Sequence, residues 1–191
     1  VGTFSFFPSK NLGAWGDGGL IVTQEQALAE RLRRLRTHGG AKQYHHDEVG
    51  YNSRLDTLQA AILLAKLPHL AGWTAGRQRV AQRYSEAFAG HPAVRAPVVD
   101  RMNDHIYHQY TIRAERRDEL AAYLKANGIG SAIYYPLGLH LQPCFAYLGY
   151  RAGSLPETEA ACRTVLSLPV FPELTNAQQD VVIAAIRQFY G

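Results

Sequence analysis

The stretch that decides the fold is Ser5-Phe6-Phe7-Pro8-Ser9-Lys10-Asn11-Leu12-Gly13-Ala14-Trp15-Gly16-Asp17-Gly18-Gly19. An apolar, strand-like run ends at Pro8, four glycines follow Lys10 within nine positions, and a second strand is predicted at residues 20–22. Proline and glycine restrict the backbone here to a turn, so Lys10 is predicted to occupy a fixed point between two strands. A lysine amine held in this way can form a Schiff base with a carbonyl-bearing cofactor. An ordinary lysine in a glycine-rich connection would show the same local pattern.

This stretch resembles the lysine motif of the DegT family of pyridoxal-phosphate-dependent nucleotide-sugar aminotransferases. Three later segments resemble further signatures of that family: Gly50–Ala61, His105–Tyr110, and Tyr135-Pro136 together with Leu139–Pro143. The four signatures occur in the family's order and are spread over almost the whole chain. A single glycine-rich loop would be a weak signal, whereas this series is specific.

The resemblance implies an α/β fold that corresponds to the C-terminal half of a fold type I aminotransferase. Residues 1–90 are expected to be the remainder of the cofactor-binding large domain, with the lysine turn and a long connecting helix. Residues 91–191 are expected to form a small C-terminal α+β domain. Family members are about twice as long as these 191 residues, so the groups that bind the pyridine nitrogen and stack on the ring are expected upstream. The 191-residue chain alone is therefore expected to be inactive.

Hydrophobic periodicity and turn residues predict the remaining elements. One long helical stretch is predicted over 54–88, with an apolar face formed by Leu55, Leu58, Ala61, Ile62 and Ala65 and with a bend or break at Pro68 and Gly72. Further helices are predicted over 25–36 and 118–127, from Pro156, and from Thr175, where Gln178 completes a capping box. In the last of these helices Val182, Ile186 and Phe189 share one face. Strands are predicted over 107–113 and 131–135.

The resemblance also implies roles for individual residues. Lys10 would hold pyridoxal 5'-phosphate as a Schiff base and move a proton in the reaction, and Ser5 would donate a hydrogen bond to the cofactor phosphate. Asn52 would reach the phosphate of the neighbouring subunit's cofactor, and Arg54 would bind an anionic group of the substrate or amino donor. The partner is therefore expected to be a second copy of the chain, with active sites shared across a homodimer. Tyr135 and His140 are candidates for lining the substrate pocket, although a satisfied loop histidine explains His140 equally well.

The function that the resemblance implies is transfer of an amino group from glutamate or glutamine to a nucleotide-linked keto-sugar, in cell-surface polysaccharide or amino-sugar biosynthesis. Alternatives are a sugar dehydratase or a cyclic-ketone synthase of the same family, or a non-catalytic remnant that acts in dimerisation or binding. Retention of Lys10 argues against the dehydratase, because that chemistry replaces the lysine with histidine. The net charge of +4 and the arginines of the 25–36 helix favour an anionic substrate. No recognition module accompanies them, so nucleic acid is not an expected partner.

Two pairs of histidines, His45/His46 and His105/His108, lack a third ligand at useful spacing, so no metal site is predicted. The chain has neither an apolar run long enough to span a bilayer nor a signal peptide at its start, which favours a cytoplasmic location without membrane association. Cys144 and Cys162 are eighteen positions apart and are expected to be reduced, buried thiols.

Overall fold

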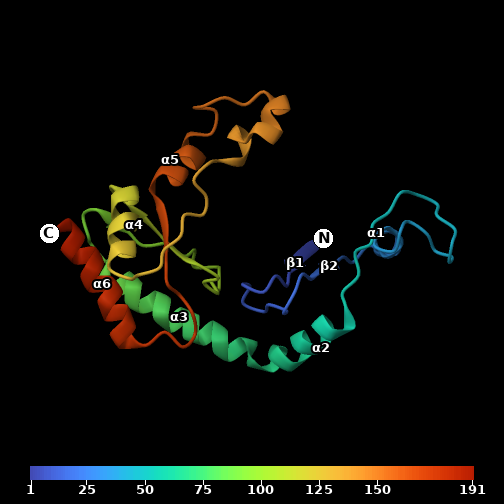
Figure 1. Cartoon of the computed structure of the whole chain (residues 1–191), viewed down its shortest axis with the longest axis horizontal. Helices are drawn as coiled ribbons and strands as arrows, with labels where there is room; N and C mark the ends of the chain where they lie inside the picture. The colour runs from blue at the N-terminus through green and yellow to red at the C-terminus, as the bar shows by residue number, and fades with distance from the viewer. The chain divides into compact units, whose positions relative to one another are not determined.

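The computed structural model describes residues 1–191, which divide into two compact units, Val1–Ala71 and Gly72–Gly191. Unit 1 contains the strands β1 (Gly2–Ser5) and β2 (Gly19–Val22), the helices α1 (Gln26–Leu35) and α2 (Thr57–Lys66), and the short 3-10 helix η1 (Leu67–His69). Helix α3 (Leu70–Ala87) begins at the boundary and lies almost entirely in unit 2 (Figure 1). This division differs from the predicted boundary between the large and small domains, which lies near residue 90. Unit 2 begins before residue 90 because Val80 and Tyr84 of α3, and Phe88 just after this helix, belong to its core.

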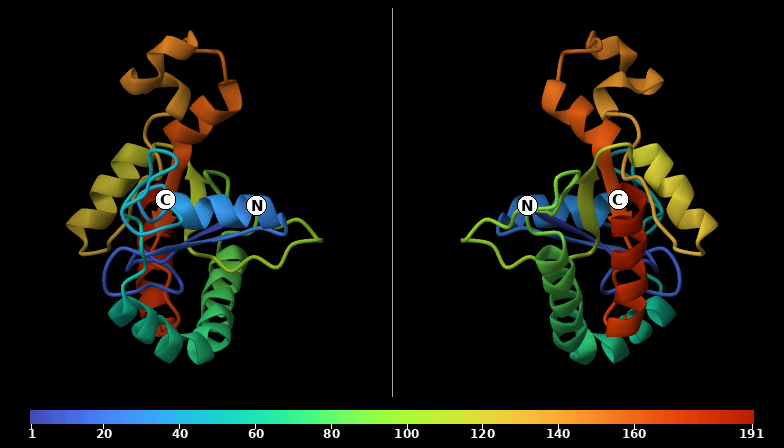
Figure 2. Two further views of the ribbon diagram at one scale, coloured as in Figure 1. Left: turned by 90° about the vertical axis from the view of Figure 1, so that its right-hand side faces the viewer. Right: turned by 90° about the vertical axis from the view of Figure 1, so that its left-hand side faces the viewer.

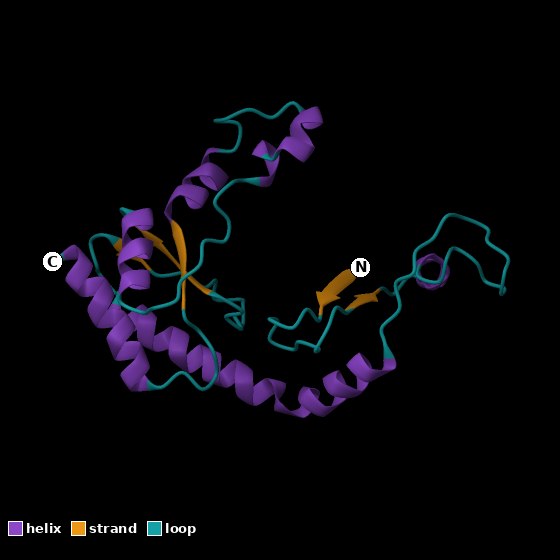
Figure 3. Cartoon of the chain, in the orientation of Figure 1, coloured by secondary structure: helices purple, strands orange, loops and turns teal.

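In unit 1, β1 and β2 pair antiparallel as a hairpin in which Gly2 lies opposite Val22 and Ser5 opposite Gly19. Loop then connects α1 to α2, as Figure 3 shows. This unit buries little apolar surface: Ala14 and Leu63 are its buried apolar residues. The predicted apolar face of the 54–88 stretch is therefore wrong in its first part, since Leu58 is 63% exposed and the buried residue of α2 is Leu63.

The predicted break at Pro68 is confirmed, because η1 separates α2 from α3 there. Proline has no backbone N–H to donate and its ring crowds the preceding turn, which favours a tighter local helix. Gly72 lies inside α3 and does not interrupt it.

Unit 2 is built on an antiparallel sheet in the order β3-β4-β5, formed by β3 (Val94–Arg95), β4 (Tyr110–Ala114) and β5 (Val165–Leu168). Its helices are α3, α4 (Arg117–Ala126), α5 (Pro156–Thr164) and α6 (Asn176–Tyr190), with the 3-10 helices η2 (Leu139–Leu141) and η3 (Pro143–Leu148) between α4 and α5. The core combines α3, α4, α6 and the sheet; its largest fully buried side chains include Tyr84, Phe88, Tyr110, Ile112, Leu120, Leu124, Leu166 and Ile186. Burial of such side chains is the main driving force for this part of the fold.

Helix α6 forms as predicted. The capping box is present, with Thr175 accepting from the Gln178 backbone N–H and the Gln178 side chain accepting from the Thr175 N–H. Val182 and Ile186 are buried and Phe189 packs against the core, which confirms the predicted apolar face.

Two strand predictions need correction. Residues 107–109 precede β4, and the 131–135 segment forms only an isolated bridge in which Ala132 lies opposite Ser167. Gly130 and Pro136 flank that segment and leave too few residues for a ladder. Strand β5 was missed because its four residues continue directly from α5. Cys144 is exposed and Cys162 is half-buried, so the prediction of two buried thiols is wrong. None of the helices combines the length and apolar character that crossing a bilayer requires.

Candidate functional site

The turn that carries Lys10 connects β1 to β2 and is closed by backbone hydrogen bonds. The Phe6 N–H donates to the Gly18 carbonyl at 2.8 Å, and the Lys10 N–H donates to the Phe7 carbonyl at 2.9 Å. A Cβ atom at Gly13 would lie 2.4 Å from the Pro8 carbonyl oxygen, a separation that no side chain tolerates. Glycine is therefore required where the turn folds back, and Lys10 has a defined position on it.

Helix α2 anchors this turn. Gln59 Oε1 accepts two hydrogen bonds from consecutive backbone N–H groups, those of Trp15 at 2.8 Å and Gly16 at 3.0 Å. Lys66 Nζ donates to the Gly13 carbonyl on the same turn. The far end of the lysine turn is thus tied to α2 at three backbone groups.

Sequence reasoning missed Gln59 because its spacing suggests another role. Asp56 and Gln59 read as a capping box at the start of α2, and Asp56 does cap the helix by accepting from the Leu58 N–H at 2.8 Å. The Gln59 side chain, which a capping box would turn back to Asp56, instead binds the lysine turn. The capping spacing explains the helix start but not this second use of the residue.

Lys10 and Ser5 lie at the start of the turn, in one continuous segment. Lys10 is partly buried and has no carboxylate within ion-pair distance. Ser5 Oγ accepts from the Phe7 N–H at 3.3 Å, which leaves its own hydrogen available for a ligand. An amine nucleophile and a hydroxyl donor are therefore five positions apart on a short, backbone-defined segment.

Asn52 and Arg54 form a second group in unit 1. Arg54 Nε donates to Asn52 Oδ1 at 3.2 Å, and Asn52 lies opposite Thr37 in an isolated β-bridge just after α1. Both residues line a cavity of about 900 Å³ together with Arg33 and Arg36. Such a concentration of guanidinium groups suits an anionic ligand. Neither Lys10 nor Ser5 lines this cavity.

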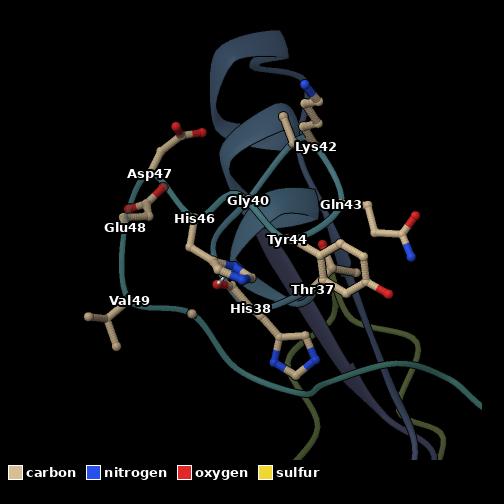
Figure 4. A pocket seen from close by; sticks show the side chains of 12 residues that line it. Thr37, His38, Gly40, Lys42, Gln43, Tyr44, His46, Asp47, Glu48 and Val49 are labelled. Atoms are coloured by element: carbon tan, nitrogen blue, oxygen red, sulfur yellow. Dashed lines mark hydrogen bonds between the residues drawn. The ribbon is translucent and has the colours of Figure 1, made fainter.

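A second cavity, of about 960 Å³, lies in the loop of residues 37–50 and contains none of the predicted site residues (Figure 4). His46 Nδ1 lies 2.9 Å from the His38 carbonyl oxygen. The side chains of Lys42, Tyr44 and His38 point in different directions rather than toward a common centre. The cavity therefore does not assemble a reactive group.

In unit 2, Tyr135 is 71% exposed, whereas His140 is buried. His140 Nε2 lies 3.1 Å from Glu159 Oε1 on α5. The pKa of the Glu159 carboxyl is lowered below its usual range, most strongly by the hydrogen bond from the Gly153 backbone N–H and next by the hydrogen bond with the His140 side chain. The His140 side chain is thus engaged by a carboxylate within its own unit.

Unit 1 thus presents a lysine on a fixed turn and a cavity lined by three arginines. Residues 1–187 match the DegT/DnrJ/EryC1/StrS aminotransferase family, and the chain belongs to that family. The expected α/β class is confirmed by matches to fold type I aminotransferase structures.

Two curated relatives and one solved structure match almost the whole chain. The chain is 53% identical over 191 residues to the "Pleiotropic regulatory protein" of Geobacillus stearothermophilus, covering 98% of this chain and 51% of that protein. It is 46% identical to dTDP-3-amino-3,4,6-trideoxy-alpha-D-glucose transaminase of Streptomyces venezuelae, covering 99% of this chain and 50% of that protein. The structure of S. venezuelae DesV in complex with a ketimine intermediate matches with a TM-score of 0.93 at 45% identity, covering 98% of this chain and 50% of that one. The chain spans about half the length of the curated relatives it matches.

Proposed function

We propose that the protein transfers an amino group from glutamate or glutamine to a nucleotide-linked keto-sugar, with pyridoxal 5'-phosphate held on Lys10. The observation that carries this proposal is the lysine turn, because Gly13 and the Gln59 hydrogen bonds fix the backbone around a lysine that has no counter-ion. Membership of an aminotransferase family and the nucleotide-sugar transaminase among the relatives support it.

The residues present fit the cofactor. Lys10 supplies an amine for its aldehyde, and Ser5 has a free hydroxyl hydrogen for its phosphate. When bound, the cofactor supplies an electron sink that stabilises negative charge at the α-carbon of the amino donor. Lys10 Nζ would take the proton from that carbon, and the fixed turn would keep the amine within reach of it.

Asn52 and Arg54 would bind anionic groups, and Arg33 and Arg36 add positive charge to the same cavity. Because Lys10 and Ser5 do not line this cavity, we assign Asn52 and Arg54 to the active site of a neighbouring copy, with two sites shared across a homodimer. We further propose a cytoplasmic location, roles for Tyr135 and His140 on the substrate side, and a large-domain part ending near residue 90. The 191-residue chain alone is expected not to sustain turnover.

The cofactor assignment is tested in the full-length protein by reduction with borohydride and peptide mapping. We expect the cofactor to remain covalently attached to the peptide that contains Lys10. Lys10→Ala should abolish transamination and leave the far-ultraviolet circular dichroism unchanged, and Lys125→Ala, at an exposed lysine of α4, serves as the control. Attachment to Lys42, Lys66 or Lys125 would refute the assignment.

Site sharing is tested by mixing two inactive proteins, Lys10→Ala and the double variant Asn52→Ala, Arg54→Ala. A hybrid dimer would contain one intact site, so part of the activity should return. Heterodimers that form without any activity would contradict the shared site.

A further inference from the structure

Residues 134–155 form an arm that projects from the sheet and from α3, α4 and α6 of unit 2 (Figures 1 and 2). The arm contains η2 and η3 and exposes a series of large apolar side chains: Tyr134, Tyr135, Leu137, Leu139, Tyr147, Leu148, Tyr150 and Leu155. Residues exposed in this way do not hold a segment in one conformation. Ring contacts within the arm, such as that between His140 and Tyr150 with centroids 6.0 Å apart, are joined by polar contacts at its base.

Those contacts converge on Glu159, in the first turns of α5. Its carboxylate accepts from the Gly153 N–H, at 2.8 Å to Oε1 and 2.9 Å to Oε2, and from the Leu155 N–H at 3.3 Å. It also contacts His140 Nε2 at 3.1 Å, and the two side chains are only 4% and 12% exposed. One carboxylate thus connects His140, in the first third of the arm, with the end of the arm at Gly153 and Leu155. Hydrogen bonds to an ionised acceptor are stronger than neutral ones, and shielding from water strengthens them further.

The beginning of the arm rests on the same group. A Cβ atom at Gly138 would lie 2.8 Å from both Cε1 and Nδ1 of His140 and 3.1 Å from Thr158 Cγ2. The backbone at Gly138 therefore packs directly on the His140 ring, three residues after Tyr135. The orientation of His140, which Glu159 fixes, sets the path of the chain that presents Tyr135.

We propose that Glu159 is a positioning residue for the sugar half-reaction. It holds His140 and the amides of Gly153 and Leu155, and through them it orders the arm so that Tyr135 meets the nucleotide-linked keto-sugar. This inference rests on the proposed function. Glu159 itself does not contact substrate.

The test compares Glu159→Ala and Glu159→Gln in the full-length protein with the control Glu157→Ala. Glu157 lies on the same helix and is exposed, so its removal alters charge and helix composition without touching the arm. Hydrogen exchange of peptides covering residues 137–155 reports the order of the arm independently of activity. We expect about tenfold faster exchange in Glu159→Ala, which corresponds to about 1.4 kcal/mol, an intermediate effect in Glu159→Gln, and none in Glu157→Ala.

Kinetics of the two half-reactions separate positioning from general damage. KM for the keto-sugar should rise in the order wild type, Glu159→Gln, Glu159→Ala, while the half-reaction with the amino donor keeps its rate. Unchanged exchange in Glu159→Ala would refute the role of Glu159 in ordering the arm. Faster exchange with an unchanged keto-sugar KM, or an equal loss in both half-reactions, would refute positioning of the substrate. A wild-type protein that performs neither half-reaction would overturn the proposed function itself, and the exchange data would still decide whether Glu159 orders the arm.

Discussion

Replacing Gln59 with alanine should loosen the turn that carries Lys10. Gln59 Oε1 accepts from the Trp15 and Gly16 amides at 2.8 and 3.0 Å, and alanine removes both acceptor contacts. A neutral hydrogen bond contributes about 0.5–1.5 kcal/mol net. Because one oxygen serves both donors, the combined loss is expected to be about 1–2 kcal/mol rather than the full sum. Alanine has a high helix propensity, so α2 itself should remain intact.

Hydrogen exchange of the Trp15 and Gly16 amides measures this loss directly. A cost of about 1–2 kcal/mol for holding the turn closed corresponds to roughly 5- to 30-fold faster exchange. Gln59→Glu retains an acceptor oxygen and should stay close to wild type. If Gln59→Ala left both amides unchanged, or if Gln59→Glu exchanged as fast as Gln59→Ala, the reasoning that Gln59 holds the lysine turn would be refuted.

Three further predictions concern unit 2. Ile112→Ala, at a fully buried position in β4, should lower the free energy of unfolding by about 2–5 kcal/mol in urea titrations, and a loss below 1 kcal/mol would contradict its place in the core. Thr175→Ala removes the cap of α6 and should cost about 1 kcal/mol, a loss that Thr175→Ser should largely restore. The native pKa of Glu159 is lowered. Its stabilisation of the folded arm is therefore present above the usual glutamate pKa of about 4.3 and is lost as pH falls through the lower native value. Protection of the arm in hydrogen exchange should therefore fall between about pH 5 and 3 more in wild type than in Glu159→Gln, and equal pH dependence would contradict this assignment.

Local signals in the sequence predicted most of the helices and the lysine turn. The Pro8 and glycine punctuation, the capping box at Thr175 and the break at Pro68 each depend on a few neighbouring residues, so they could be identified without knowing the rest of the fold. Strand β5 was not predicted because it is four residues long and forms the start of an apolar run that directly follows a helix. Its identity as a strand comes from pairing with β4, which is distant in sequence.

The residues of the candidate site also divide into those that a local motif predicted and those whose roles depend on distant contacts. Lys10 and Ser5 belong to one segment, so the motif alone placed them together. The role of Gln59 depends on contacts with residues 43 and 44 positions away. The role of Glu159 depends on the path of a loop. A glutamine in a capping position and a glutamate in the first turns of a helix both have ordinary local explanations, and only the folded structure shows which partners they bind.

Arg77 on α3 couples the motions of two segments of unit 2. Its guanidinium group donates to the carbonyl oxygens of Tyr107, His108 and Val170, at 3.1, 3.2 and 3.1 Å. Two segments more than sixty positions apart are therefore joined through a single cation. If either segment moves away from α3, the guanidinium group loses part of its acceptors, so opening of one segment should favour opening of the other. A ligand that stabilised the His105–Tyr110 signature would consequently slow the motion of the chain around Val170 as well, although it touched nothing there.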